Sequence, residues 1–236
     1  MNPASDPGDR AYLDLHRPRY AILIEALGRC LADAGRPRGA VRILDVGPAP
    51  QTGLIRQAFP AARIDTLGFA NPQAAAREGE RHVAFDLNEA PQRGRWPDLG
   101  PYDAIVFAEV LEHLTTAPRA VFECMAAWLD PAGVLIVQTP NALALHKRLR
   151  ALAGRNPLGA GGAVTARANS PAHFREYTLD EVVELGRAAG LEPAGAQVRN
   201  HFRHPRLAHR AYDRLTEALP AGTRQGITIC LRRPRA

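Results

Sequence analysis

Short apolar segments rich in β-branched residues alternate with amphipathic segments along most of this chain. Such alternation predicts strands separated by helices, and helical connections make neighbouring strands run parallel. The predicted strands cover residues 41–46, 63–68, 82–86, 102–107, 134–139, 194–198 and 226–232. The predicted helices cover residues 20–35, 72–78, 118–129, 141–152, 178–190 and 205–219, and one more begins near residue 52. The pattern is typical of an α/β fold, a doubly wound, mainly parallel seven-stranded sheet with helices on both faces.

The size and composition of the chain fit one domain, residues 1–236. The 236 residues are 46% hydrophobic and 23% charged, close to the average of globular proteins. No apolar run approaches the roughly 18 residues that a membrane span needs, and the first ten residues are polar, so we expect no membrane span and a cytoplasmic location. Cys30, Cys124 and Cys230 lie far apart among apolar residues, which predicts core positions rather than disulfides or a zinc site.

Positive charge is concentrated in the second half of the chain. Residues 141–236 hold 16 basic and 7 acidic side chains, whereas residues 1–140 hold 14 and 17. Five arginines are interleaved with histidines and aromatic residues: Arg199, Arg203, Arg206, Arg210 and Arg214. Such a cluster either attracts a phosphate-bearing or otherwise acidic partner, or forms the solvated surface of an arginine-rich protein.

The first predicted strand ends in a loop of small and ring-constrained residues. A doubly wound sheet binds its ligand beyond the carboxyl ends of its strands. Gly47 and Pro48 let a ligand approach the backbone of this loop closely, and Asp45 can organise the turn. Ala49 and Gln51 stand where the dinucleotide-binding pattern G-x-G-x-x-G needs glycine, so the loop is not that motif.

Two more polar loops follow the third and fourth predicted strands. Asp86, Leu87 and Asn88 offer a carboxylate, an apolar side chain and an amide, a set that can bind an adenine amino group and cover its ring. Residues 108–114 read AEVLEHL. Because these loops share one edge of the sheet, they predict a ligand site there.

Five segments in order make the chain resemble a known family. They are ILDVGPAPQTG, AFDLNEAP, YDAIVFAEVLEHL, DPAGVLIVQTPN and HFREYTLDEVVELGRAAGL. Together they resemble the class I S-adenosylmethionine-dependent methyltransferases over about residues 10–232, and EVLEHL with HFREYT is typical of a large bacterial subgroup of them. The resemblance implies S-adenosylmethionine as the cofactor.

The resemblance also implies which residues hold that cofactor. Its contacts come from the loops after the first, third and fourth strands: the methionine part at Asp45, Gly47 and Pro48, the adenine at Asp86 and Leu87, and the sulfonium at Ala108 and Glu109. One position departs from the family pattern, because Gly68 stands where the second strand usually ends in an acidic residue that binds the ribose, and Asp65 comes three residues early. Either Phe69 and a main-chain group cover the ribose, or another residue supplies the carboxylate.

The resemblance divides the chain into functional segments. Residues 1–10 are expected to be a flexible tail, and residues 11–35 a helical segment that folds over the cofactor, with Arg19 as a partner for its carboxylate. Residues 140–177 are the expected substrate lid, because a basic helix there is followed by a glycine-rich stretch.

A hydroxyl or ammonium acceptor must lose a proton during methyl transfer. His113 and His173 are the candidate catalytic bases, because histidine titrates near neutral pH and both lie in loops that should reach the site. Each also has a purely structural interpretation: His113 as a cap of the short helix after the fourth strand, and His173 as an anchor of the lid.

The spacing of acidic residues and histidine allows a metal site. Glu109, Glu112 and His113 lie at i, i+3 and i+4, which places them on one face of a helical turn, and His173 could complete a site for Mg²⁺ or Mn²⁺. The small-RNA 2′-O-methyltransferases are similar at these places. A divalent metal is possible, but we expect the metal-free arrangement, because a single turn of Glu and His is common and His173 is sixty residues away.

The sequence therefore predicts a methyltransferase acting on an oxygen or nitrogen of a small molecule, such as a sugar or a natural-product intermediate. The first alternative is an RNA 2′-O-methyltransferase with a divalent metal, which the basic second half favours and the lack of an RNA-binding appendage opposes. The second is a non-catalytic binding protein that kept the fold, supported only by Gly68. The sequence indicates no oligomeric state.

Overall fold

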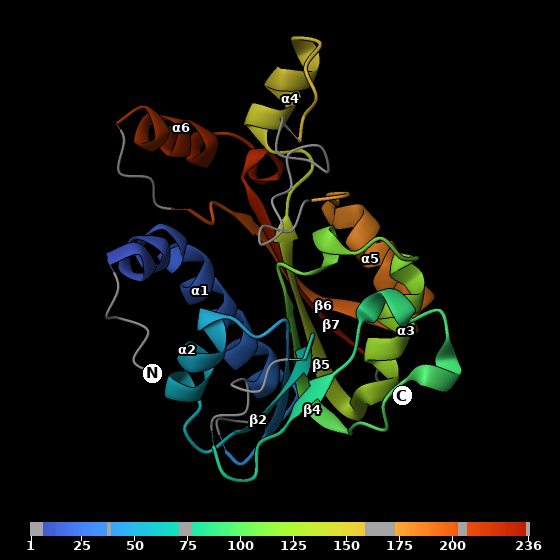
Figure 1. Ribbon diagram of the computed structural model, residues 1–236. Helices are drawn as coiled ribbons and strands as arrows, with labels where there is room; N and C mark the ends of the chain where they lie inside the picture. Colours follow the sequence, from blue (N-terminus) through green and yellow to red (C-terminus); the bar gives the residue numbers. More distant parts are fainter. Residues whose placement is uncertain (1–6, 37–38, 71–76, 159–172, 203–206, 235–236) are drawn as a thin grey trace.

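The computed structural model describes residues 7–36, 39–70, 77–158, 173–202 and 207–234. Seven strands form one sheet in the order β3-β2-β1-β4-β5-β7-β6 (Figure 1). They are β1 (Arg42–Val46), β2 (Arg63–Gly68), β3 (His82–Ala84), β4 (Tyr102–Ala108), β5 (Leu129–Pro140), β6 (Glu192–Arg199) and β7 (Gly226–Arg232). All pairs are parallel except those that β7 makes with β5 and β6. The predicted doubly wound, mainly parallel sheet is thus confirmed.

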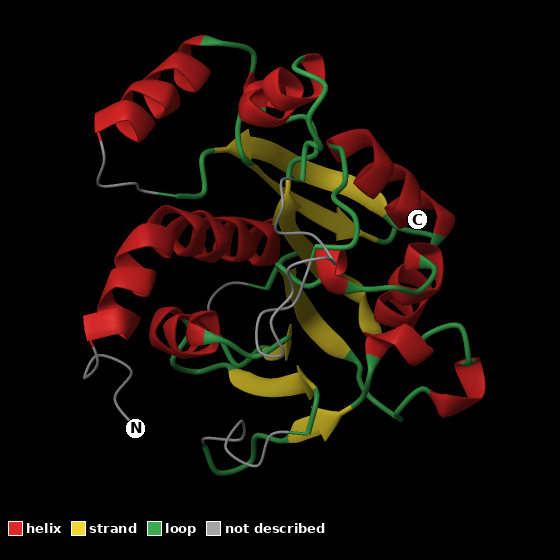
Figure 2. Cartoon of the chain, turned by 45° about the horizontal axis from the view of Figure 1, so that its top comes forward, coloured by secondary structure: helices red, strands yellow, loops and turns green. Residues whose placement is uncertain are grey.

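Helices cover both faces of the sheet (Figures 1 and 2). On one face lie α1 (Pro7–Asp33) and α2 (Pro50–Ala58); on the other lie α3 (Pro118–Trp128) and α5 (Leu179–Ala188). Each face has its own core, because successive residues of a strand point to opposite sides. In β1, Ile43 belongs to the core that contains Leu23 and Leu27 of α1, whereas Leu44 belongs to the core that contains Val121 of α3 and Val182 of α5.

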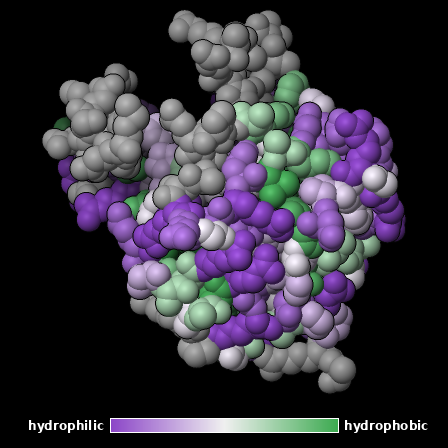
Figure 3. All heavy atoms as spheres, turned by 60° about the horizontal axis from the view of Figure 1, so that its bottom comes forward, coloured by the Kyte–Doolittle hydropathy of each residue, from purple (hydrophilic) through white to green (hydrophobic). Residues whose placement is uncertain are grey.

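Two further helices, α4 (Leu145–Leu152) and α6 (Leu207–Ala218), lie beyond the carboxyl end of β5 (Figure 1). Short 3₁₀ turns follow strands or precede them: η1 (Leu87–Glu89), η2 (Arg93–Arg95), η3 (Leu111–His113) and η5 (Ala221–Thr223). In the part of the chain that the structure describes, no helix combines the length and apolar character that a membrane crossing requires. Figure 3, which shows the end of the molecule away from α4, has mostly hydrophilic side chains with small hydrophobic patches.

The N-terminal helix differs from its prediction. It begins at Pro7 rather than near Tyr20 and continues through Pro18, so the expected tail of residues 1–10 is helical from Pro7 onward. The amide of Arg19 donates to the carbonyl of His201, 3.2 Å away, so a long-range contact holds the helix just after the proline. Periodicity alone could not show this, because a proline inside a helix is locally unfavourable.

The lid is described in part. Its basic helix is confirmed as α4, although α4 begins at Leu145 rather than at residue 141. Residues 159–172 of the predicted lid, and residues 72–76 of the predicted helix 72–78, lie outside the described part of the chain. The three cysteines are free and buried, as predicted.

Candidate functional site

A pocket of about 760 Å³ opens at the carboxyl edge of the sheet, between α1, α4 and the loops after β1 and β4. The structure brings six of the predicted site residues to its wall: Arg19, Gly47, Ala108, Glu109, His113 and His173. The other predicted residues, Asp45, Pro48, Phe69, Asp86 and Leu87, are not among its lining residues. The pocket therefore joins the expected methionine and sulfonium positions to both candidate bases.

Asp45 lies beneath the loop after β1 and is fully buried. Its Oδ2 accepts a hydrogen bond of 2.5 Å from Thr52 Oγ1, while Oδ1 has no hydrogen-bond partner among the described residues. Burial raises the pKa of this carboxyl to about 7, although its polar neighbours Thr52 and Gln51 oppose the rise. Asp45 is thus a buried carboxyl whose ionised form is only weakly supported, by Thr52, Gln51 and the charge of Arg56.

The pKa of Asp45 makes stability depend on pH. Because the folded-state pKa of about 7 exceeds the ordinary 3.8, the free protein should lose stability as pH rises from about 4 through 7, by an amount on the order of 4 kcal/mol. Asp45→Asn should remove most of this slope. Urea unfolding at pH 5 and pH 8 measures it, and parallel pH dependence of wild type and variant would show that Asp45 is not its source.

Gly47 adopts a φ of 73°, a conformation that favours glycine. A Cβ at this position would lie 2.6 Å from Cγ2 of Val110. A Cβ on Gly68 would lie 3.2 Å from Cδ of Pro48, so the ribose position at the end of β2 sits tightly against the same loop. Phe69 follows it with a side chain that is 76% exposed, open to cover a ligand.

Asp65 does not reach the ribose position. It accepts a hydrogen bond from the hydroxyl of Tyr102, the first residue of β4, and lies 3.5 Å from Nη2 of Arg42, the first residue of β1. These partners place its carboxylate at the amino ends of the strands, the edge opposite the pocket. An acidic residue three positions early therefore does not replace the usual one.

The loop after β3 holds the two predicted adenine residues. Asp86 caps η1, because its Oδ1 accepts a hydrogen bond of 2.9 Å from the amide of Asn88. The Leu87 side chain is only 5% exposed and packs into the core, so it presents little surface for an adenine ring in this structure.

Arg19, Glu109 and His201 meet behind the pocket. Nη1 of Arg19 lies 3.0 Å from Oε2 of Glu109, and Nδ1 of His201 lies 3.7 Å from Oε1. Although burial raises the pKa of Glu109, these two neighbours hold it below its usual value. Glu109 also has a φ of 55°, rare outside glycine, and such strain concentrates at functional sites.

Sequence reasoning missed His201, which is 1% exposed. Its ring packs on Gly226, where a Cβ would overlap it. A glycine in a strand can indicate that another group approaches the backbone closely, so Gly226 could have indicated a neighbour of this kind.

Two unpartnered oxygens test whether the expected cofactor fits. Oδ1 of Asp45 and Oε1 of Glu109 are both buried without a hydrogen-bond partner among the described residues. A buried carboxylate oxygen without a hydrogen bond costs free energy, and a hydrogen bond from an ammonium group removes that cost. Arg19, with several guanidinium donors, suits a carboxylate. The donor set therefore fits an amino-acid end such as that of S-adenosylmethionine.

The candidate bases lie at the other end of the pocket. The rings of His113 and His173 are 4.8 Å apart and meet edge to face. Glu112 lies beneath them, fully buried, with Oε2 accepting a hydrogen bond from Thr139. Burial and the charge of Glu109 raise the pKa of Glu112 well above its usual value, which favours the uncharged form of this carboxyl.

The hypothesis that Glu109, Glu112, His113 and His173 converge on one metal ion is wrong for Glu109. Ligand atoms of Glu112, His113 and His173 all lie within 4.8 Å of one another, but Glu109 is engaged with Arg19 instead. The spacing argument assumed one helical turn, whereas η3 begins only at Leu111 and Glu109 before it has a positive φ. Three groups remain in reach of a shared ion.

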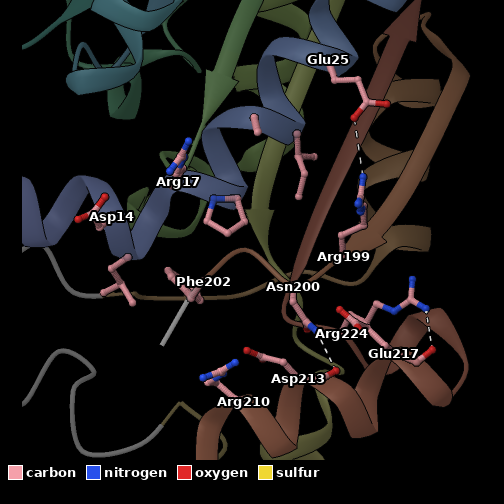
Figure 4. Close-up of a pocket in the computed structure, with 14 residues that line it drawn as sticks. Asp14, Arg17, Glu25, Arg199, Asn200, Phe202, Arg210, Asp213, Glu217 and Arg224 are labelled. Atoms are coloured by element: carbon pink, nitrogen blue, oxygen red, sulfur yellow. Dashed lines mark hydrogen bonds and ion pairs between the residues drawn. The ribbon is translucent and has the colours of Figure 1, made fainter. Parts of the chain in front are cut away.

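A second hollow of about 1020 Å³ lies between α1 and α6 (Figure 4). The described residues that line it include four arginines and four carboxylates: Arg17, Arg199, Arg210 and Arg224, with Asp14, Glu25, Asp213 and Glu217. Arg203 and Arg206 of the basic cluster lie outside the described residues, and Arg214 is exposed and does not line the hollow. The described part of the hollow is therefore of mixed charge rather than a basic patch.

A family model described as "Methyltransferase domain" matches residues 14–194, more than three quarters of the chain. The chain belongs to this methyltransferase family. The resemblance to class I S-adenosylmethionine-dependent methyltransferases is thereby confirmed, and the match begins within α1 and takes in every loop that lines the pocket before β6.

Solved structures share the methyltransferase fold. A Burkholderia thailandensis 1,6-didemethyltoxoflavin-N1-methyltransferase with bound S-adenosylhomocysteine is 18% identical, with a TM-score of 0.54 over 97% of this chain and 83% of that one. A SAM-dependent methyltransferase from Archaeoglobus fulgidus is 12% identical, with a TM-score of 0.58 over 97% and 100%. The mitomycin 7-O-methyltransferase MmcR is 16% identical, with a TM-score of 0.51, and this chain spans only 59% of its length.

Proposed function

We propose that this methyltransferase moves a methyl group from S-adenosylmethionine to an oxygen or nitrogen of a small molecule. The observation that carries the proposal is the pair of buried carboxylate oxygens on Asp45 and Glu109 that accept no hydrogen bond from the described residues, beside Arg19 and the tight turn at Gly47. These groups match the ammonium and carboxylate of an amino acid. Arg19 still has donors beyond those that Glu109 and Tyr20 use.

When bound, the cofactor supplies an electrophilic methyl group on a good leaving group, so the chain's task is alignment and proton removal. His113 and His173 line the pocket beyond Glu109 and can accept the acceptor's proton. Glu112 lines the same pocket, and burial and the charge of Glu109 raise the pKa of its carboxyl, which favours the uncharged form.

The acceptor is proposed to be a sugar or a natural-product intermediate. The pocket is small and lined by polar and apolar groups together, and two neighbours of the same fold are by name an N1- and a 7-O-methyltransferase of such compounds. Free, buried cysteines suit a reducing compartment, which supports a cytoplasmic location as part of the proposal.

Binding of S-adenosylhomocysteine tests this function. Calorimetry should detect one site per chain, and Asp86→Ala should weaken binding by about 10- to 100-fold if its carboxylate reaches the adenine. Asp86→Asn keeps an oxygen that can cap η1 but removes the charge, and Asp98→Ala is the control, because it removes an exposed carboxylate that does not line the pocket. No binding heat on the folded wild type would reject the enzyme and favour the non-catalytic alternative.

An RNA 2′-O-methyltransferase with a metal is the second candidate, favoured by the cluster of Glu112, His113 and His173. We expect the metal-free arrangement, because the raised pKa of Glu112 disfavours the ionised form that a metal needs, and Lys147 already pairs with the neighbouring Glu176. Elemental analysis should find no stoichiometric Mn²⁺ or Mg²⁺, and excess chelator should leave S-adenosylhomocysteine binding unchanged. One Mn²⁺ per chain, lost in His173→Asn, would favour the RNA enzyme.

A further inference from the structure

We propose that Glu176 and Lys147 are positioning residues that fix His173 with its proton on Nδ1, so that Nε2 is the base that takes the acceptor's proton. The inference rests on the proposed methyl transfer and assigns the base to His173 rather than His113. It follows from a row of three side chains along the wall of the pocket: Lys147, Glu176 and His173.

The row is held by short contacts. Nδ1 of His173 lies 3.1 Å from Oε1 of Glu176, and the ammonium of Lys147 donates to Oε2 of the same carboxylate. Lys147 also donates to the carbonyl of Asn141, 2.9 Å away. Both oxygens of Glu176 are thus engaged, one by the lysine and one by the imidazole.

The ion pair between Lys147 and Glu176 is buried. The side chains of Lys147 and Glu176 are only 9% and 6% exposed, and Lys147 is the single lysine among the chain's 30 basic residues. A buried ion pair forms only with good geometry and satisfied donors, so placing one here fixes both groups. Although burial raises the pKa of Glu176, His173 and Lys147 hold it below the usual value, which keeps an ionised carboxylate at Nδ1.

The backbone around His173 is also fixed. The amide of Phe174 donates to the carbonyl of Glu112, 2.9 Å away, and the amide of Ala142 donates to the carbonyl of Tyr177, 3.0 Å away. These bonds dock residues 174–177 onto η3 and the end of β5. His173 therefore enters the pocket from a supported segment.

The two histidines have different neighbours. Nε2 of His113 lies 3.9 Å from Oε1 of Glu112, a carboxyl whose pKa is raised well above its usual value by burial and by the charge of Glu109. His173 has an ionised carboxylate on Nδ1, which stabilises an imidazolium and selects the tautomer with Nε2 unprotonated. This asymmetry favours His173 as the base.

The proton then has a defined route. As the acceptor's oxygen or nitrogen bonds to the methyl carbon, the carbon–sulfur bond breaks and its electron pair neutralises the sulfonium. The acceptor's proton passes to Nε2 of His173, and Glu176 stabilises the resulting imidazolium. Water takes that proton after the product leaves.

The tautomer of His173 tests the proposal without any acceptor. At a pH about two units above the usual histidine pKa of 6.5, ring ¹⁵N spectra of the wild type should show the proton on Nδ1. In Glu176→Gln, Lys147 should hold the amide oxygen and leave the NH₂ group toward Nδ1, so the proton should move to Nε2. In Lys147→Met with Glu176→Gln, the amide can turn and the proton should return to Nδ1.

His173→Asn assigns the resonance. The proposal is overturned if His173 carries its proton on Nε2 in the wild type, or if Glu176→Gln leaves the tautomer unchanged. Calorimetry with S-adenosylhomocysteine on the same samples separates the two claims: binding with the wrong tautomer rejects only the positioning role, and the right tautomer without binding rejects only the proposed function. On an acceptor that turns over, Glu176→Gln should lower kcat about 10²- to 10⁴-fold, and the double variant should recover part of the loss.

Discussion

Replacing Gly47 by valine should abolish detectable binding of S-adenosylhomocysteine. Gly47 has a φ of 73°, where a β-branched residue is strained, and its Cβ would lie 2.6 Å from Val110 Cγ2. The turn must therefore shift, and with it the backbone above Asp45 and the space that the cofactor's methionine part needs. Calorimetry at a ligand concentration about 100 times the wild-type Kd is the measurement.

The matched control for Gly47→Val is Gly53→Val in α2. Gly53 is exposed, has no positive φ and has open space where its Cβ would stand, so binding should be nearly unchanged. Adding Val110→Ala to Gly47→Ala removes the clash but not the strained φ, which separates the two causes. Wild-type affinity in Gly47→Val would show that the cofactor does not use this turn.

Replacing Gly226 by alanine should strongly destabilise the protein. The new Cβ would overlap the ring of His201, which is 1% exposed and cannot swing into solvent. Overpacking costs typically 1–3 kcal/mol, and at the upper end of that range the melting temperature of a chain of this size falls by about 6–12 °C. Thermal unfolding followed by circular dichroism measures the change.

Two comparisons sharpen the Gly226 prediction. Gly195→Ala in β6 adds a Cβ in open space and should change the melting temperature little. Adding His201→Ala to Gly226→Ala removes the overlap and should restore part of the lost stability, while weakening the support behind Glu109. A melting temperature of Gly226→Ala equal to that of wild type would mean that His201 does not pack on this backbone.

The architecture could be predicted because it depends on local periodicity. Every predicted strand is present within a few residues, since apolar runs such as those of β1 and β4 are buried on both faces. The pocket's position also followed, because the carboxyl ends of parallel strands share one edge. Gly47 and Glu109 could be expected at this edge, because each directly follows one of these strands.

The partners of the site residues could not be predicted from the sequence. His201 meets Glu109 from more than ninety residues away, and Glu176 meets Lys147 across twenty-nine, so no local pattern relates them. The prediction that Glu109 and Glu112 lie on one helical face is wrong for a different reason. Glu109 has a positive φ and precedes η3, so the two residues do not belong to one helical turn.

The position of β7 has a consequence for how the protein is made. β7 lies between β5 and β6, so β6 has no neighbouring strand until residues 226–232 have been synthesised. Until then β5 and β6 both expose unpaired edges, which are prone to pair with other chains. His201 also lacks Gly226, on which its ring packs, before that point. The nascent chain therefore cannot assemble the wall behind Glu109 until β7 has emerged from the ribosome, so the site is completed only by a strand made after all the others of this sheet.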